Sequence, residues 1–387
     1  MDTHALVQHK SHQGPGSYAE ANSLAAARAR ARLVARFEEG RRRLPNIIQA
    51  LDENVPDDYL VVGSAIEFGV DNGQLRAGFA HRAHSVHGHA LAQLAQRVDI
   101  PKAYIDLLAT QQPELLAHNL QQRYAQGNGA RFLARVVEGQ VRGWLSSKFK
   151  RLDSGPVAVA FMAAARELGA VPVAGQVLDT KISLKWMLPV VYEPIANEVL
   201  AVGLHLRNSD YGDGALSICF YIERVWCTNG MSVEEGLRKV HLGARLDDVA
   251  ISDDTRELEM KTLVSATRDV VTNLLTPEMI AGKMALIAEA DAKQVPLKQT
   301  LEDLRKRARL SKAETERCTE LAAVDDVELL PPVRIKPKHG YTSAWRLAHV
   351  VSALANESVP ERALELQDLA GQLAGIDTVS NPASKAA

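Results

Sequence analysis

The chain has 387 residues, of which 46% are hydrophobic and 24% are charged, and its formal net charge at pH 7 is −2. These proportions are ordinary for a globular protein and allow roughly two or three domains. The near-neutral balance excludes a uniformly basic coat that would bind nucleic acid over the whole surface. It leaves room for a local basic face, because binding depends on where the charges cluster.

Cysteine usage and the lack of a targeting signal predict a cytoplasmic protein. The three cysteines, Cys219, Cys227 and Cys318, are too few and too scattered for a disulfide framework or a four-cysteine metal site. The first residues contain no apolar run suited to a signal peptide, and no window approaches ~18 consecutive apolar residues. We therefore expect no membrane span, no metal and no cofactor.

The N-terminal sequence predicts a tail followed by a long helix. Residues 1–16 are rich in His, Gln, Gly and Pro and predict a disordered tail. Residues 17–55 hold an Ala- and Arg-rich helix that we expect to end near Gly40 or Leu44, because Pro45 follows.

Residues 56–253 predict an α+β core. Two tight turns are marked by residues that tolerate positive φ, namely Asp71-Asn72-Gly73 and Glu138-Gly139. The strand-like stretches come in hairpin-sized groups separated by helical ones, which favours antiparallel sheets over a doubly wound parallel sheet.

Residues 254–375 predict a helical C-terminal region that packs on the core, with one helix capped by Thr342 or Ser343. Residues 376–387 predict a second disordered tail. The expected fold class is therefore α+β, with hairpin-rich antiparallel sheets, a long N-terminal helix and a helical C-terminal part.

One stretch, residues 204–231, shows the clearest strand alternation. Leu216, Ile218, Phe220 and Ile222 fall on one strand face, and seven turn-forming residues separate this strand from the one before it. This pattern predicts a hairpin with a medium-length loop.

The loop and the turn after the hairpin contain the residues that we single out as a candidate functional loop: Asn208, Asp210, Asp213 and Asn229. Their oxygens could ligate a hard cation, but the ligand ladder of a calcium loop with its distal Glu is missing, so we predict no metal site. An enzyme that uses this loop with Cys227 and His241 stays open as an alternative, although nothing local brings the two groups together.

Two further patterns have ordinary explanations. His81, His84, His87 and His89 lie close together, but their spacing matches no closed zinc site, so we expect a solvated loop. Residues 93–108 have the rhythm of a helix-turn-helix, yet the second helix offers few basic groups. A packed helical hairpin is therefore favoured over a DNA-reading one.

Basic residues cluster in the middle of the chain. Between residues 121 and 189 there are ten Lys and Arg against four Asp and Glu, and several cations alternate with aromatic residues. Cations that neutralise phosphates, beside rings that stack on bases, are what a single-strand groove requires. The candidate nucleic-acid-binding residues are Arg142, Trp144, Lys148, Phe149, Lys150, Arg151, Lys185 and Trp186, and Arg28, Arg32 and Arg36 add an i, i+4 stripe on the N-terminal helix.

Several phrases resemble one family. They include "ALAQLAQRVDIPKAYIDLL", "GWLSSKFKRLD", "GLHLRNSDYGDGALSICFYIERVWCTNGM" and "YTSAWRLAHVVSALANE", in that order. The order resembles the phage- and plasmid-associated domain-of-unknown-function family number 932 over roughly residues 85–355. The resemblance implies a setting on mobile elements and no catalytic residues that can be carried over.

Together these patterns predict a non-catalytic nucleic-acid-binding protein of a phage or plasmid, such as a single-stranded DNA binding or annealing factor in replication or recombination. The expected partner is single-stranded DNA, with no membrane, and homo-oligomerisation stays open. A protein-interaction or scaffold factor of a mobile element is the main alternative, and the enzyme described above is the other.

Overall fold

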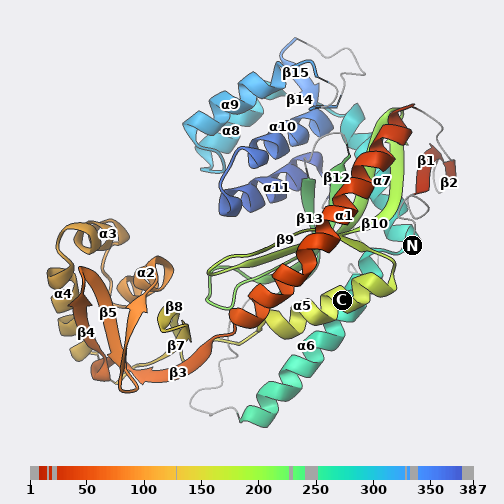
Figure 1. Ribbon diagram of the computed structural model, residues 1–387. Helices are drawn as coiled ribbons and strands as arrows, with labels where there is room; N and C mark the ends of the chain where they lie inside the picture. The colour runs from red at the N-terminus through yellow and green to blue at the C-terminus, as the bar shows by residue number, and fades with distance from the viewer. Residues whose placement is uncertain are drawn as a thin grey trace, which may run out of the picture.

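The structure is a computed structural model, and it describes residues 8–14, 17–19, 24–127, 129–225, 230–239, 252–326, 329–331 and 339–376. Two sheets with helices packed on them form two separate parts of the molecule (Figure 1). We call residues 57–146 the small domain. We call the larger sheet, which contains β9 to β13, the main sheet, and this sheet with the helices packed on it the main body.

The small domain combines a sheet with three helices. Its sheet has the order β3-β7-β8-β6-β5-β4, antiparallel except where β6 pairs with β8. The strands are β3 (Asp57–Val62), β4 (Glu67–Asp71), β5 (Gln74–Phe79), β6 (Arg82–Val86), β7 (Arg131–Val137) and β8 (Gln140–Ser146). The helices are α2 (Gly88–Arg97), α3 (Lys102–Gln111) and α4 (Pro113–Ala125), and a 3₁₀ turn covers Gly63–Ala65.

The main sheet has the order β13-β12-β11-β10-β1-β2, with β9 also pairing with β10. Its strands are β1 (Gln8–Gly14), β2 (Ser17–Ala19), β9 (Val171–Val177), β10 (Ile182–Ile195), β11 (Glu198–Asn208), β12 (Leu216–Arg224) and β13 (Gly230–Lys239). The pairs from β9 to β13 are antiparallel, and β1 joins β10 in parallel.

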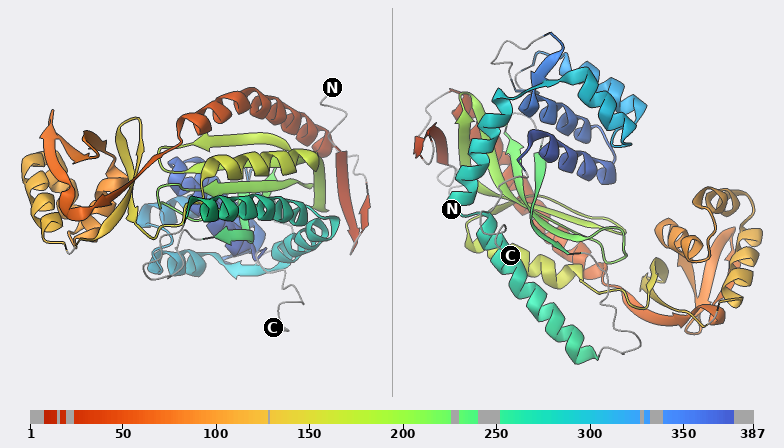
Figure 2. Two further views of the ribbon diagram at one scale, coloured as in Figure 1. Left: turned by 90° about the horizontal axis from the view of Figure 1, so that it is seen from below. Right: turned by 180° about the vertical axis from the view of Figure 1, so that it is seen from behind.

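Helices cover both faces of the main sheet (Figure 2). The face that carries Leu204 and Phe220 packs against α5 (Ser154–Glu167) and α6 (Asp253–Leu274) in the largest apolar core. The opposite face packs against α1 (Leu24–Glu53), whose Leu33 and Phe37 contact Met187 and its neighbours. Alternation along each strand thus sends apolar side chains to two separate helix layers.

The C-terminal helices complete the main body. They are α7 (Pro277–Ala292), α8 (Leu297–Lys306), α9 (Lys312–Ala322), α10 (Ala344–Asn356) and α11 (Pro360–Ala374), with the short strands β14 (Gln294–Pro296) and β15 (Tyr341–Ser343) between them. In the described part of the chain, no single helix has the length and apolar character to cross a membrane. The bent pair α6–α7 passes that test jointly, by length and composition only.

Several local predictions are confirmed. Asn72 and Gly73 adopt positive φ in the β4–β5 turn, and Glu138 and Gly139 do the same between β7 and β8. The Ser343 hydroxyl accepts a hydrogen bond from the amide of Arg346 and so caps α10. The predicted hairpin is β11–β12, and the four apolar residues of β12 all lie in the largest core.

Three long-range features differ from the expectations. Strand β1 forms within the segment expected to be a disordered tail, and residues 56–253 hold two sheets instead of one core. Helix α1 continues through Gly40 and Pro45 to Glu53, because Ile47 and Leu51 in its last turns pack against the main sheet. This packing outweighs the backbone hydrogen bond that Pro45 removes.

The contact between α1 and β9 depends on a glycine. A methyl group at Gly40 would overlap the backbone carbonyl of Pro172, so α1 approaches β9 this closely only without a side chain there. We expect Gly40→Ala to lower the free energy of unfolding by about 1–3 kcal/mol, the usual cost of overpacking. Urea denaturation measures this loss. The control is Gly69→Ala in β4, where an added methyl meets no atom within 4 Å and the loss should be much smaller.

Candidate functional site

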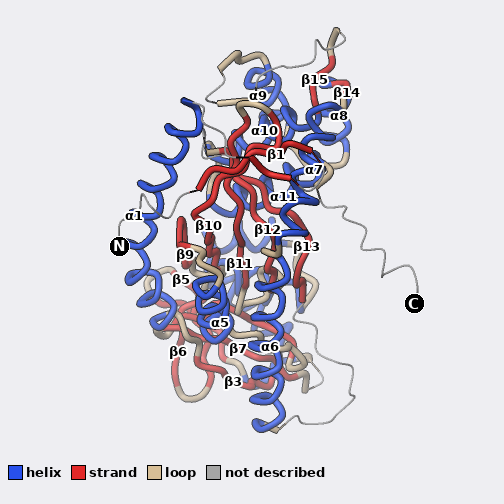
Figure 3. The backbone as a smooth tube through the Cα atoms, turned by 90° about the vertical axis from the view of Figure 1, so that its right-hand side faces the viewer, coloured by secondary structure: helices blue, strands red, loops and turns tan. Residues whose placement is uncertain are grey.

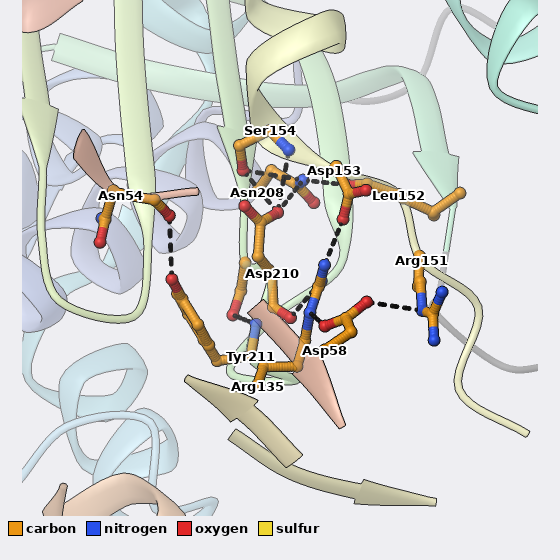
Figure 4. Close-up of polar contacts among 11 residues, drawn as sticks. Asn54, Asp58, Arg135, Arg151, Leu152, Asp153, Ser154, Asn208, Asp210 and Tyr211 are labelled. Atoms are coloured by element: carbon orange, nitrogen blue, oxygen red, sulfur yellow. Dashed lines mark hydrogen bonds and ion pairs between the residues drawn. The ribbon is translucent and has the colours of Figure 1, made fainter. Parts of the chain in front are cut away.

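A buried arginine connects the small domain to the main body. Arg135, in β7, is 1% exposed and lies among groups from three other parts of the chain (Figure 4). Its Nε donates to Asp58 Oδ1 at 2.8 Å, its Nη2 to Asp153 Oδ1 at 2.7 Å, and its Nη1 to the carbonyl of Asp210 at 2.8 Å. A buried guanidinium is tolerated only when it is paired in this way.

The β11–β12 loop caps helix α5 from outside the helix. Asp210 Oδ1 accepts hydrogen bonds from the Ser154 amide at 2.9 Å and from the Ser154 hydroxyl at 2.7 Å. Asn208 Nδ2 donates to the carbonyl of Leu152 and, at 3.2 Å, to Asp210. Since a carboxylate at a helix N-terminus satisfies orphan amides, Asp210 fixes where α5 begins relative to the loop.

In this network, burial and the neighbouring charges have opposite effects on the pKa values of Arg135 and Asp210. Burial opposes the charge of Arg135, but Asp153 and Asp58 together raise its pKa. Burial raises the pKa of Asp210 to about 6, although Arg135 and Ser154 act in the opposite direction. Burial therefore makes Asp210 easier to protonate than an exposed aspartate.

A pocket of about 360 Å³ opens beside the network, where the end of α1, the small domain and the main sheet meet. Its walls include Leu51, Pro156 and Leu178, and its polar lining includes Asn54 and Lys181. The Tyr211 hydroxyl donates to the carbonyl of Asn54 and so ties the β11–β12 loop to the end of α1.

Two of the three aromatic residues of the predicted interface, Trp144 and Trp186, are wrong. Trp144 is fully buried in the small-domain core, and Trp186 is 5% exposed in the core of the main body. Rings buried in two separate cores cannot stack on bases of a bound strand. Phe149 is half-buried and lies just after β8, beyond the small domain.

The basic half of the predicted interface is dispersed. Lys150 pairs with Glu259 of α6 at 2.7 Å, and Arg151 pairs with Asp58 at 2.8 Å. Arg142 donates to Asn54, which lines the pocket of about 360 Å³, while Lys148 is exposed. The predicted cations thus form no single concave surface.

Lys185 lies on the main-sheet face that α11 covers. Its Nζ donates to Gln367 Oε1 of α11 at 2.8 Å and sits 4.6 Å from the centroid of the Tyr221 ring. Burial lowers the pKa of Lys185 to about 7, and Arg36 and Arg207 add to this effect. Arg207 is itself paired with Asp368 of α11 at 2.6 Å, so α11 occupies the place that a phosphate would need.

The candidate functional loop is structural where the structure describes it. Asn208 and Asp210 hold α5, and Asp213 accepts from Thr180 and pairs with Lys181 at 3.1 Å. Asn229, Cys227 and His241 lie outside the described residues, so the enzyme alternative stays untested. Among the described residues, no group of three or more His, Cys, Asp or Glu could hold a metal ion.

The histidines before α2 have separate roles. His84 is buried against the ring of Phe79, with centroids 4.5 Å apart. The His87 side chain accepts from the amide of His89 and caps α2, and His89 Nε2 lies 3.0 Å from the carbonyl of Tyr211. The expected solvated loop is therefore a strand and a helix start.

The sequence patterns did not indicate that Arg135, Asp58 and Ser154 belong to one network. Arg135 interrupts the apolar strand "RFLARVV", and a charge at an inward position of a strand is the signal that could have marked it. Its carboxylate partners are 77 and 18 residues away, which no local pattern connects.

Helix α1 carries exposed positive charge along much of its length. Seven arginines fall between Arg28 and Arg43, against two glutamates. Figure 3 shows α1 along one side of the molecule. The arginines with exposed side chains are Arg28, Arg32, Arg41, Arg42 and Arg43, and Glu39 pairs with both Arg42 and Arg43.

Comparison with protein-family models, with curated proteins and with solved structures finds no match to this chain. The family resemblance described above therefore stays a prediction, and the function has to be argued from the chain's own geometry.

The raised pKa of Asp210 predicts a pH-dependent stability. Because burial raises the pKa of Asp210 to about 6, above its ordinary value, the folded state binds the proton more tightly than the unfolded chain does. The contribution of Asp210 to the free energy of unfolding is thus greatest below its pKa in the unfolded chain. This contribution is lost as pH rises through its pKa in the folded state. For wild type we expect a loss on the order of 3 kcal/mol from this residue between about pH 4 and pH 7.

Asp210→Asn should remove that loss while its amide oxygen still accepts from Ser154. Urea unfolding at a series of pH values gives the two slopes. Asp57→Asn, at an exposed position of β3, is the matched control and should follow wild type. Parallel slopes for wild type and Asp210→Asn would contradict the assignment of this titration to Asp210.

Proposed function

We propose that this protein binds nucleic acid through the sugar–phosphate backbone and catalyses no reaction on it. The exposed arginines of α1 support this proposal most directly. Guanidinium groups match phosphate oxygens with two parallel hydrogen bonds, and they keep their charge at any physiological pH.

The dimensions of α1 suit an extended chain of phosphates. Arg28 and Arg43 are separated by about 22 Å along a helix that rises 1.5 Å per residue. Arg28, Arg32 and Arg43 share one side of this helix at 3.6 residues per turn, and that side faces away from the buried residues Leu33 and Phe37. A backbone laid along α1 would therefore meet several cations in succession.

This mode of binding is independent of base sequence. The predicted stacking rings, Trp144 and Trp186, are buried, so affinity would come from phosphate neutralisation and the release of counterions. Single-stranded DNA is the partner that the sequence pattern predicts, and a setting on a phage or plasmid is the one that the resemblance implies. Both remain proposals that binding assays can separate.

Neutralising the arginine side of α1 should weaken binding strongly. For Arg28→Gln/Arg32→Gln/Arg42→Gln/Arg43→Gln we expect roughly tenfold or greater loss of affinity for a fluorescent oligothymidine at low salt. The slope of log K against log salt should fall by up to about 3, since each phosphate contact on a single strand contributes about 0.7. Fluorescence anisotropy over a sodium chloride series measures both quantities.

The control removes four exposed charges elsewhere: Lys298→Gln/Lys306→Gln/Arg307→Gln/Lys312→Gln on and beside α8 and α9. It should bind like wild type. Wild-type protein that does not bind at low salt would overturn the proposed function. Equal losses in the two variants would show non-specific attraction instead of an α1 surface. Duplex DNA in the same assay tests the predicted preference for single strands.

A further inference from the structure

A second surface of α1, on a different side from Arg28 and Arg32, has no role in the proposed function. Between Arg41 and Glu53, α1 presents an open and shallow surface, and among the described residues only those of α1 line it. It contains an apolar centre of Leu44, Pro45 and Ile48, and Ile48 is 42% exposed.

This apolar stripe continues the face that α1 buries. Phe37 lies in the core against the main sheet, and Leu44 and Ile48 follow it at seven and eleven residues, which is nearly the same side of a helix. Helix α1 extends toward the small domain (Figure 1), and exposure rises along it from the buried Phe37 through the half-buried Leu44 to the exposed Ile48. The exposed apolar part of this stripe is small, and charged residues border it at both ends.

The charges at the two ends of the stripe are complementary to each other. Arg41 lies at its N-terminal end, and Asp52 and Glu53 lie at its C-terminal end. A second α1 that runs antiparallel across the stripe, with a two-fold axis between Asn46 and Ile47, would bring Arg41 of each copy to Asp52 of the other. The same register places Pro45 of each copy against Ile48 of the other.

We propose that this stripe is a homodimer interface in which two copies of α1 pack antiparallel. A two-fold interface requires one surface patch to be complementary to itself, and a stripe that is basic at one end, apolar in the middle and acidic at the other meets that requirement. The interface is small, so the dimer is weak and concentration-dependent. This inference does not depend on nucleic-acid binding, because Arg28, Arg32 and Arg43 lie on the other side of α1.

Charge reversal tests the register directly. Because each ion pair occurs twice in a two-fold dimer, Arg41→Glu and Asp52→Arg should each weaken dimerisation roughly tenfold, by replacing two attractive pairs with two repulsive ones. The double variant Arg41→Glu/Asp52→Arg restores opposite charges across the interface and should recover dimerisation. Sedimentation velocity of the full chain over a wide concentration range measures the dissociation constant.

Two controls separate the interface from general effects. Arg28→Glu reverses a charge on the other side of α1 and should leave the dissociation constant unchanged, while Ile48→Glu should give a monomer with a wild-type unfolding midpoint. A wild-type monomer at every concentration would overturn the proposal. Dimerisation that both single reversals leave intact, or that the double variant does not restore, would overturn it as well.

Discussion

The placement of the small domain depends on the buried charge of Arg135. A guanidinium that is almost fully withdrawn from water needs nearby opposite charge and hydrogen-bond acceptors, and removing one partner of such a group typically costs about 3–5 kcal/mol. Here the partners come from β3, from the start of α5 and from the β11–β12 loop. Satisfying one side chain therefore specifies how the small domain, α5 and the main sheet meet.

The same requirement explains why a surplus of positive charge in the sequence did not become a binding surface. Arg135 and Arg151 share Asp58, and Lys150 pairs with Glu259, which is 109 residues away along the chain. A charge count over residues 121–189 cannot include these partners, because they lie outside the window that is counted. Surplus charge in a window indicates an interface only where the fold leaves it uncovered.

Local structure was predictable because its causes are local. The alternation in β12, the positive-φ turns at Asn72 and Glu138, and the Ser343 cap each depend on a few neighbouring residues. The continuation of α1 past Pro45, the separation into two sheets and the burial of Trp144 depend on tertiary packing, which local patterns do not contain. The network around Arg135 was not predicted for this reason. The sequence does show Arg135 as a charged residue within an apolar strand and Asp210 as an acidic residue just after one.

Helix α1 shows how one element can carry three separate surfaces. Its buried side, with Leu33 and Phe37, anchors it to the main sheet. In the proposed function the side with Arg28, Arg32 and Arg43 would meet phosphates, and in the proposed dimer the stripe around Ile48 would meet a second copy. In an antiparallel pair joined through that stripe, the two arginine sides would face away from the shared axis. Dimerisation would then present two basic surfaces without covering either. One dimer could hold two segments of nucleic acid, which a protein that brings two strands together needs to do. Surfaces on different sides of one helix do not compete for the same space.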